Sequence, residues 1–270
     1  MDALDRPYLT VVLLPEGMSR QQAATVLAAS GVTDEVTAYQ RLAKEPPMIL
    51  GQFDPGPAHR AAIDMIKVGG DAMCITLDDL VRVGETRRIK DLRIGHGGIE
   101  YDLWRGEGGF LAFDAMKVLV RARLRSTTSR PVDPGPNVGF NIGGPLDAGV
   151  DFDGSDAGAT NVKTTHLSDK LDIHAYDGSV YQIDGDKFGY GVLGELRGHS
   201  DGQNMDQMCE LLHHLASHVI VDDFYSLFKP PPGYHRMQLP RMKLQQEDPG
   251  FAFYSRWTAL VYRHVMGSAT

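Results

Sequence analysis

The closest match to a catalytic motif is Gly198-His199-Ser200-Asp201-Gly202, which fits the G-x-S-x-G pattern of a nucleophile elbow. In such an elbow a buried strand leads into the serine and a helix follows it, so that the hydroxyl is held at the top of a sheet. A helical pattern does follow Ser200, but the preceding segment, Gly194-Glu195-Leu196-Arg197, is short and polar. The sequence therefore favours a polar loop that caps the next helix over an elbow.

A serine nucleophile also needs an acid and a base, and the residues after Ser200 contain candidates for both roles. Asp222 or Asp223 could orient a histidine, and His235 or His264 could accept the proton of the serine. The order Ser, Asp, His is the one that accompanies an elbow serine. The alternative function is therefore a serine hydrolase with Ser200, Asp222 and His235 as its catalytic residues.

Neither a metal site nor a cofactor site is predicted. Asp151, Asp153 and Asp156 lie close together, but the glycine and the final carboxylate that a calcium-binding loop of the EF-hand type needs are not at the required positions. His213 and His214 are neighbours on a predicted helix, where adjacent side chains point in different directions. They cannot chelate one ion as a pair one turn apart could.

Composition and charge restrict the class of protein. The 270 residues are 42% hydrophobic and 23% charged, which is ordinary for a globular chain. The formal net charge of −8 argues against a nucleic-acid-binding protein whose affinity comes from neutralising phosphates. Residues 229–270 carry a local charge of +4, so residues 1–228 carry −12. An acidic body with a basic tail predicts that the tail either folds back on the body or meets an acidic partner.

The same composition indicates a compartment. Two cysteines, Cys74 and Cys209, are too few for a disulfide framework, so a reducing environment is expected. The apolar runs are shorter than the ~20 residues of a membrane-spanning helix. Asp2 and Asp5 occupy the place of the basic start of a secretory signal. The last helix has few basic residues for a lipid surface, so we expect a cytoplasmic protein without a membrane role.

Residues 1–80 form the first predicted domain, a small α/β unit. Apolar runs predict strands at residues 8–14, 48–50 and 72–77. Ser19 and Gln22 have capping-box spacing for a helix that Gly31 ends. The order strand, helix, helix, strand, helix, strand predicts a sheet covered by helices on one face.

The second and third helices of this unit have their own signals. A helix that begins near Thr33 or Asp34 is predicted to place Val36, Tyr39 and Leu42 on one face. A helix-start signal at Asp54-Pro55-Gly56-Pro57 begins the third helix, and Gly69-Gly70 ends it.

The unit resembles the C-terminal domain of the ribosomal stalk protein. The resemblance rests on the order of elements, on the Gly31-Val32 link, on Pro46 and Pro47 before the middle strand, and on Gly70-Asp71-Ala72 at the last strand. In that family the domain recruits translation GTPases through a lysine-rich helical face. The corresponding residues 33–40 are acidic and polar here. The resemblance therefore implies a ferredoxin-like, stalk-protein-like fold and protein partners, and does not imply factor recruitment at the ribosome.

Residues 81–228 predict a second domain of antiparallel strands. Short runs rich in β-forming residues occur at residues 89–94, 99–104, 110–113, 116–124, 171–176 and 180–183. Asp177-Gly178 predicts a hairpin between the last two runs, and a helix is expected from about Asn204. Residues 126–168 are rich in Gly, Pro and Ser and predict a flexible insertion. The order of strands, loop, hairpin and helix resembles a pleckstrin-homology-like barrel, in which the last helix plugs one end.

Residues 229–270 predict a proline-rich basic arm that ends in a helix. The segment from Lys229 to Tyr234 contains three consecutive prolines and should run extended. Phe253, Trp257 and their helical neighbours form an apolar stripe that has to dock on another surface. The residues expected to contact a partner are Pro231, Tyr234, Arg236, Arg241, Phe253 and Trp257. For Phe253 and Trp257 the sequence favours the alternative that they are core residues.

The sequence thus predicts an α+β protein with a stalk-protein-like module, an antiparallel pleckstrin-homology-like domain and an extended arm. No intact catalytic constellation is present, and both resemblances are to binding domains. We expect a non-catalytic interaction or scaffold protein that binds a protein partner or itself. The alternative is the serine hydrolase that uses Ser200.

Overall fold

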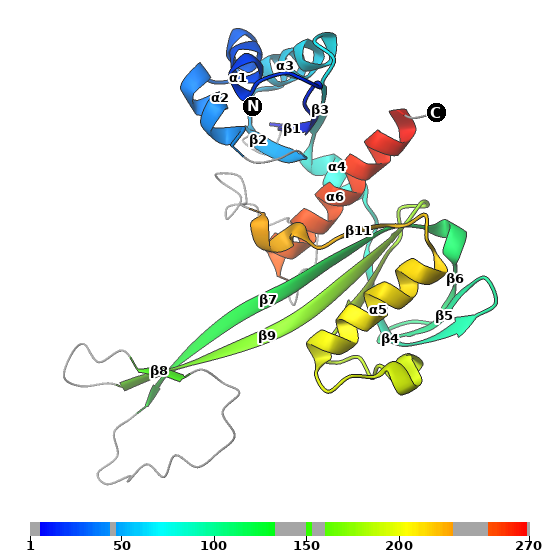
Figure 1. Ribbon diagram of the computed structural model, residues 1–270. Coiled ribbons are helices and arrows are strands. Elements are labelled where there is room, and N and C mark those ends of the chain that lie inside the picture. Colours follow the sequence, from blue (N-terminus) through cyan, green and yellow to red (C-terminus); the bar gives the residue numbers. More distant parts are fainter. Residues whose placement is uncertain (1–5, 44–46, 133–149, 153–159, 229–247, 269–270) are drawn as a thin grey trace.

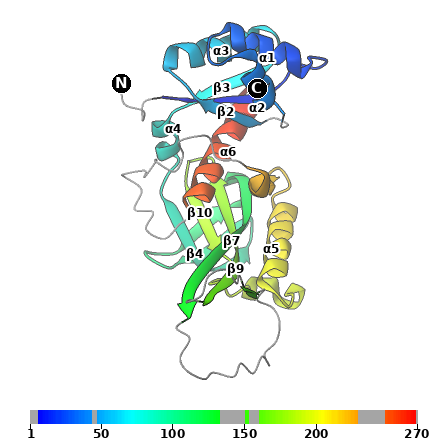
Figure 2. The same cartoon turned by 90° about the vertical axis from the view of Figure 1, so that its left-hand side faces the viewer.

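The computed structural model describes residues 6–43, 47–132, 150–152, 160–228 and 248–268. It shows the α+β chain that the sequence predicts, with two sheets and a long helix, α6 (Pro249–Ser268), between them (Figures 1 and 2). Within those residues, no helix combines the length and the hydropathy that crossing a bilayer requires.

The N-terminal unit has its strands and helices in the predicted order. They are β1 (Tyr8–Leu13), α1 (Arg20–Ala29), α2 (Glu35–Arg41), β2 (Met48–Gln52), α3 (Pro55–Lys67) and β3 (Asp71–Ile75). The sheet has the order β2-β1-β3, and both pairings are antiparallel. The three helices cover one face of this sheet (Figure 1). Leu9, Leu27, Leu50 and Met65 are buried between the two layers.

The helix boundaries follow from local hydrogen bonds that the sequence signals. Ser19 and Gln22 make the predicted capping box at the start of α1, and Gly31, with φ +80°, follows its end. Asp34 accepts a hydrogen bond from the backbone of Thr37 and so caps α2. The predicted apolar face of this helix is confirmed for Leu42, which is buried, and is wrong for Val36 and Tyr39, which are exposed. Ala38 packs into the core beside Leu42.

The last strand of this unit ends two residues before the predicted boundary. Thr76 and Asp79 form a second capping box and start the short helix α4 (Leu77–Arg82), which the sequence interpretation missed. Leu80 of α4 is buried, so the link between the two sheets is itself packed against the body.

The larger sheet is built by the segment from Thr86 to Asp222. Its strands and helices are β4 (Thr86–Gly95), β5 (Gly98–Leu103), β6 (Gly109–Ala112), η2 (Phe113–Ala115), β7 (Met116–Val132), β8 (Val150–Phe152), β9 (Thr160–Ala175), β10 (Val180–Asp184), η3 (Gly191–Leu196), α5 (Asp201–Leu215), β11 (Ile220–Asp222) and η4 (Phe224–Leu227). The strand order is β11-β7-β9-β10-β4-β5-β6, with β8 paired to β9. The antiparallel run β4-β5-β6 and the hairpin at Asp177-Gly178 are as predicted.

The predicted barrel does not form, because the larger sheet stays open. After β6 the chain passes through η2 and enters β7, which does not pair with β6. Instead β7 pairs with β9, on the side of β9 that faces away from β10. Two pairings are parallel, β10 with β4 and β11 with β7. Parallel neighbours are joined by long crossovers and leave no hairpin signal in the sequence. The strands β11 and β6 are therefore the two edges of an open sheet, whereas the sequence predicted that the sheet would close into a barrel.

The predicted flexible insertion is partly strand. β7 and β9 pair in one continuous register from Val118 and His174 out to Val132 and Thr160, so residues 126–132 and 160–168 extend the sheet. Serine and threonine dominate these segments. Threonine favours extended backbone, but polar residues on both faces erase the apolar alternation that reveals a strand. Residues 133–149 and 153–159 of the predicted insertion lie outside the described residues.

A helix covers each face of the larger sheet (Figures 1 and 2). On one face, Met205, Met208 and Leu212 of α5 pack with Leu171 and Ile173 of β9. On the other face, α6 packs with Val118, Val120 and Ala122 of β7. The opposite side of α6 meets Tyr8, Val12 and Ile75 from the uncovered face of the small sheet. The last helix of the chain is therefore the layer that the two sheets share.

The contact between α6 and the small sheet depends most on Trp257, so Trp257→Ala should destabilise the whole chain. The side chain is 3% exposed, and its Nε1 donates to Thr10 Oγ1 over 3.0 Å. Truncating a buried tryptophan typically costs about 3–5 kcal/mol, because a cavity remains where the ring was. Urea unfolding followed by circular dichroism measures this loss.

The chain provides a matched control in its second tryptophan. Trp104 is 48% exposed, so Trp104→Ala should change the free energy of unfolding by less than about 1 kcal/mol. Equal losses for the two variants would contradict the central position of α6.

Candidate functional site

Several residues that the sequence proposed for a site lie outside the described residues: Pro231, Tyr234, His235, Arg236 and Arg241. Phe253 and Trp257 are described, and both are buried inside the chain. Their neighbours are Tyr8 and Thr10 of β1 and the aromatic ring of Phe228. The apolar stripe of the last helix therefore docks on the body of its own chain, so these two rings are not available to a partner in this structure.

Ser200 has the role of a helix cap. Its Oγ accepts a hydrogen bond from the backbone of Gln203 at the start of α5. The segment before it is η3, so the strand that a nucleophile elbow needs is absent from this position. Asp222, the proposed acid, is buried on the opposite side of the sheet, where it accepts a hydrogen bond of 2.5 Å from Tyr254 of α6. Burial raises the pKa of Asp222, and in the described part of the chain neither Ser200 Oγ nor the Asp222 carboxylate is hydrogen-bonded to a histidine.

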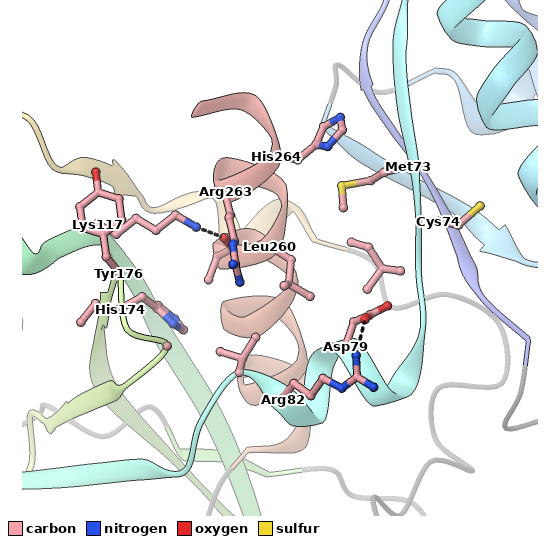
Figure 3. Close-up of a pocket in the computed structure, with 15 residues that line it drawn as sticks. Met73, Cys74, Asp79, Arg82, Lys117, His174, Tyr176, Leu260, Arg263 and His264 are labelled. Carbon is pink, nitrogen blue, oxygen red and sulfur yellow. Dashed lines mark hydrogen bonds and ion pairs between the residues drawn. The ribbon is translucent and has the colours of Figure 1, made fainter. Parts of the chain in front are cut away.

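A different group of polar residues surrounds a pocket between the two sheets (Figure 3). The pocket has a volume of about 960 Å³. Its walls come from β3 and α4, from the start of β7, from the end of β9 and from the second half of α6. The residues that carry its chemistry are Lys117, His174, Arg263, Arg82 and Cys74.

Lys117 is a buried cation on this wall. It is 7% exposed, and its Nζ donates to the carbonyl oxygen of Ala259 on α6. Burial, and secondly the charge of Arg263, lower the pKa of the Lys117 ammonium to about 8. Among the described residues no carboxylate pairs with either Lys117 or Arg263. Two positive side chains thus face the same space without a counter-ion from that part of the chain.

His174 is the second buried polar group of the pocket, and it is 2% exposed. Its Nε2 lies 2.7 Å from Ser255 Oγ, and Ser255 Oγ donates to Asp172 Oδ2 over 2.6 Å. Gln182 donates to the other oxygen of Asp172. Because the single hydroxyl proton of Ser255 goes to the carboxylate, His174 has to donate through Nε2. The other ring nitrogen, Nδ1, is then a bare acceptor, and it has no partner in the described part of the chain.

The remaining polar groups of the pocket are already engaged. Arg82 pairs with Asp79 at 3.9 Å, and Asp79 also caps α4. His264 Nε2 lies 2.8 Å from Asp71 Oδ1. Burial raises the pKa of the Cys74 thiol to about 11, so at neutral pH it stays a thiol, which is a poor nucleophile.

The imidazole and the serine hydroxyl of this site are poorly suited to act as a base or as a nucleophile. Burial, and then the charges of Arg256 and Lys117, lower the pKa of His174 to about 3, which makes its imidazole a weak base. The hydroxyl of Ser255 is committed to Asp172. A search of the described residues finds no group of three or more His, Cys, Asp or Glu side chains placed to hold a metal ion.

Sequence interpretation missed these residues because they belong to no motif. Lys117, His174 and Arg263 are separated by more than fifty residues each and meet only through the fold. One signal was present in β9, where Lys170, Asp172 and His174 alternate with the apolar Leu171 and Ile173. All three polar side chains are buried. A strand whose second face is charged but buried has to meet polar partners, here supplied by α6 and β10.

The buried neutral His174 should make the chain sensitive to acid. Its pKa is lower in the folded chain than in the unfolded one, so between pH 6.5 and about 3 the unfolded chain binds more protons and stability falls as the pH falls. The loss attributable to His174 should reach about 2 kcal/mol by pH 5. Chemical denaturation of the wild type and of His174→Gln at pH 7 and pH 5 measures it.

In His174→Gln the difference in the free energy of unfolding between pH 7 and pH 5 should be smaller than in the wild type by about 2 kcal/mol. His213→Gln is the matched control, since His213 is an exposed residue on α5. Parallel pH profiles for the wild type and His174→Gln would contradict the buried neutral state of His174.

Comparison with known proteins identified no relative from which a function could be carried over. Neither a protein-family model, nor a curated protein sequence, nor a solved structure matched the chain. The function therefore has to be argued from the residues and geometry described above.

Proposed function

We propose that the chain is a non-catalytic, cytoplasmic interaction or assembly protein, whose β7–β9 ribbon contacts a protein partner or a second copy of the chain. The observation that carries the proposal is the length of this ribbon beyond the body (Figure 1). The pairing continues from Leu124 and Ser168 to Val132 and Thr160. At about 3.4 Å per residue, this part of β7 reaches ~30 Å past the packed sheet.

The side chains show where the body ends. Ala122 and Asp169 are buried, whereas Arg125 and Leu167 are exposed, Leu167 to 57%. No helix or sheet of the described residues covers this part of the ribbon (Figure 1), and an isolated ribbon of this kind is only marginally stable in water. A partner that covers the ribbon would supply the missing layer, by packing on its faces or by pairing with an edge.

The base of the ribbon is fixed firmly to the body. The carboxylate of Asp169 is buried and accepts from Arg121 over 3.3 Å and from Arg123 over 3.1 Å. Arg121 also pairs with Asp206 of α5. Salt bridges of this kind, buried on one side, hold a fixed geometry better than pairs in open solvent. The ribbon therefore leaves the body in a defined direction, as an assembly arm requires.

The N-terminal unit supports the same class of function. Its element order, its antiparallel sheet and its one-sided helices agree with the stalk-protein-like module proposed from the sequence. The helical positions that bind partners in that family correspond to residues 33–40, and there Val36 and Tyr39 are exposed. For the larger sheet, the pleckstrin-homology-like resemblance stays a proposal about the order of elements, since no barrel closes.

The ribbon can be removed without touching either core. Replacing residues 126–166 by Asn-Gly would join Arg125 to Leu167, which already face each other in the sheet, by a two-residue turn. The shortened chain should keep the unfolding midpoint of the intact chain, because the buried clusters of the described residues include none of the deleted positions. It should lose the self-association or the partner that the intact chain shows in light scattering and affinity purification.

Substitution of Ile63 and Ile66 by Ser in the intact chain is the matched control, because these exposed residues of α3 belong neither to the ribbon nor to residues 33–40. The same oligomeric state and the same co-purifying proteins for the intact and shortened chains would remove the ribbon as the interaction element.

A further inference from the structure

The pocket between the sheets contains positive charges without a carboxylate partner and an acceptor nitrogen without a donor, as far as the described residues show. Lys117 and Arg263 place two positive charges beside it, and Arg263 is close enough to lower the pKa of the Lys117 ammonium. His174 lines the same pocket, and its acceptor nitrogen Nδ1 is buried without a partner among the described residues. Figure 3 shows Lys117 and His174 on one side of the pocket and Arg263 on α6 in front of them.

Each of these groups destabilises the folded chain as long as it has no counter-ion or hydrogen-bond partner. A buried ammonium without a counter-ion loses hydration that one carbonyl oxygen only partly replaces. An acceptor nitrogen that is buried without a donor loses a hydrogen bond to water. A ligand that brings negative charge to Lys117 and a hydroxyl proton to His174 would satisfy both.

We propose that this pocket is a binding site for a small organic anion that also carries a hydroxyl group. Lys117 and Arg263 bind the anionic group, and Nδ1 of His174 accepts a hydrogen bond from the hydroxyl. The Nε2–Ser255–Asp172 chain fixes the tautomer of the imidazole, so that Nδ1 stays an acceptor. The site is independent of the ribbon, because no residue of the ribbon lines the pocket.

Size and lining favour a small molecule over a macromolecule. The volume of about 960 Å³ lies within the range of pockets that enclose metabolites and drug-sized compounds. Ile75, Val83 and Leu260 supply apolar wall around the polar groups. Apolar walls with a few convergent polar groups are the usual composition of such sites.

The charge balance selects an anion. The lining contains Lys117, Arg82 and Arg263, against the single carboxylate of Asp79, which already pairs with Arg82. The whole chain has a formal net charge of −8, so the net positive charge of the pocket lining is opposite in sign to that of the chain. Arg263 lies on the exposed side of α6 at the rim of the pocket, where it can meet an anion as it enters.

Three probes separate the two parts of the proposed recognition. Ribose 5-phosphate carries both an anion and hydroxyls, inorganic phosphate carries the anion alone, and ribose carries the hydroxyls alone. Isothermal titration of the full chain at pH 7 should show binding of ribose 5-phosphate about tenfold tighter than of phosphate, the effect of one added hydrogen bond. Ribose should show no binding at millimolar concentration, because it lacks the anionic group.

Variants locate the site. Arg263→Gln changes an exposed residue and should fold normally while weakening the binding of ribose 5-phosphate by about tenfold, because one charged contact is lost. Lys117→Met should abolish binding. It keeps the length of the side chain and removes a buried charge, so an unchanged or higher unfolding midpoint confirms that the variant is folded. Arg105→Gln, an exposed arginine away from the pocket, is the matched control and should bind like the wild type.

Three results would overturn the proposal. One is a wild type that binds neither ribose 5-phosphate nor phosphate at millimolar concentration. Another is binding that Arg263→Gln and Arg105→Gln leave equally unchanged, because the anion would then lie elsewhere. The third is equal affinity for phosphate and ribose 5-phosphate, which would leave Nδ1 of His174 without a role.

Discussion

The docking of α6 between the two sheets is the interaction on which the rest of the structure depends. Three consecutive residues of this helix point in three directions, as the ~100° turn per residue requires. Ser255 reaches Asp172 in the large sheet, Arg256 donates to the carbonyl oxygens of Val83 and Gly84 in the link between the sheets, and Trp257 reaches Thr10 in the small sheet. One turn of helix therefore fixes the relative placement of all three parts.

The docking of α6 buries polar side chains of the large sheet at positions where only a polar side chain of α6 can supply their hydrogen bonds. Asp172 and His174 are buried on the face of the large sheet that α6 covers, and each would lose its hydrogen bond with Ser255 if the helix slid by one residue. Apolar contacts tolerate such a slip better, because they have no preferred direction. The buried polar chain therefore selects the register of α6, and the aromatic cluster supplies most of the apolar area that holds it there.

The parts of the fold that could be predicted are those that local chemistry determines. The Ser19 capping box, Gly31 and the Asp177-Gly178 hairpin each act within a few residues, and each appears where the sequence indicated. The parts that could not be predicted depend on distant partners. Trp257 meets Thr10 across almost the whole chain, the parallel pairs β10–β4 and β11–β7 have no turn signal, and Lys117 and His174 meet only after both sheets pack. The sequence predicts a flexible insertion where the Ser- and Thr-rich ribbon lies, because the ribbon is held by backbone pairing and its sequence has no apolar alternation.

The position of the pocket follows from the same architecture. The first half of α6 makes aromatic and polar contacts with both sheets. Its second half, from Ala259 to His264, contacts Lys117 of β7 and Asp71 of β3 and borders the pocket together with Lys117 and His174. A ligand bound there would contact α6, the end of β9 and the β3–α4 link at once. It would bind only the folded chain, because Lys117, His174 and Arg263 come together only when α6 is docked. Ligand binding would therefore stabilise the joint by mass action, in proportion to the logarithm of ligand concentration over Kd, and the cohesion of the two sheets would depend on the ligand as well as on α6.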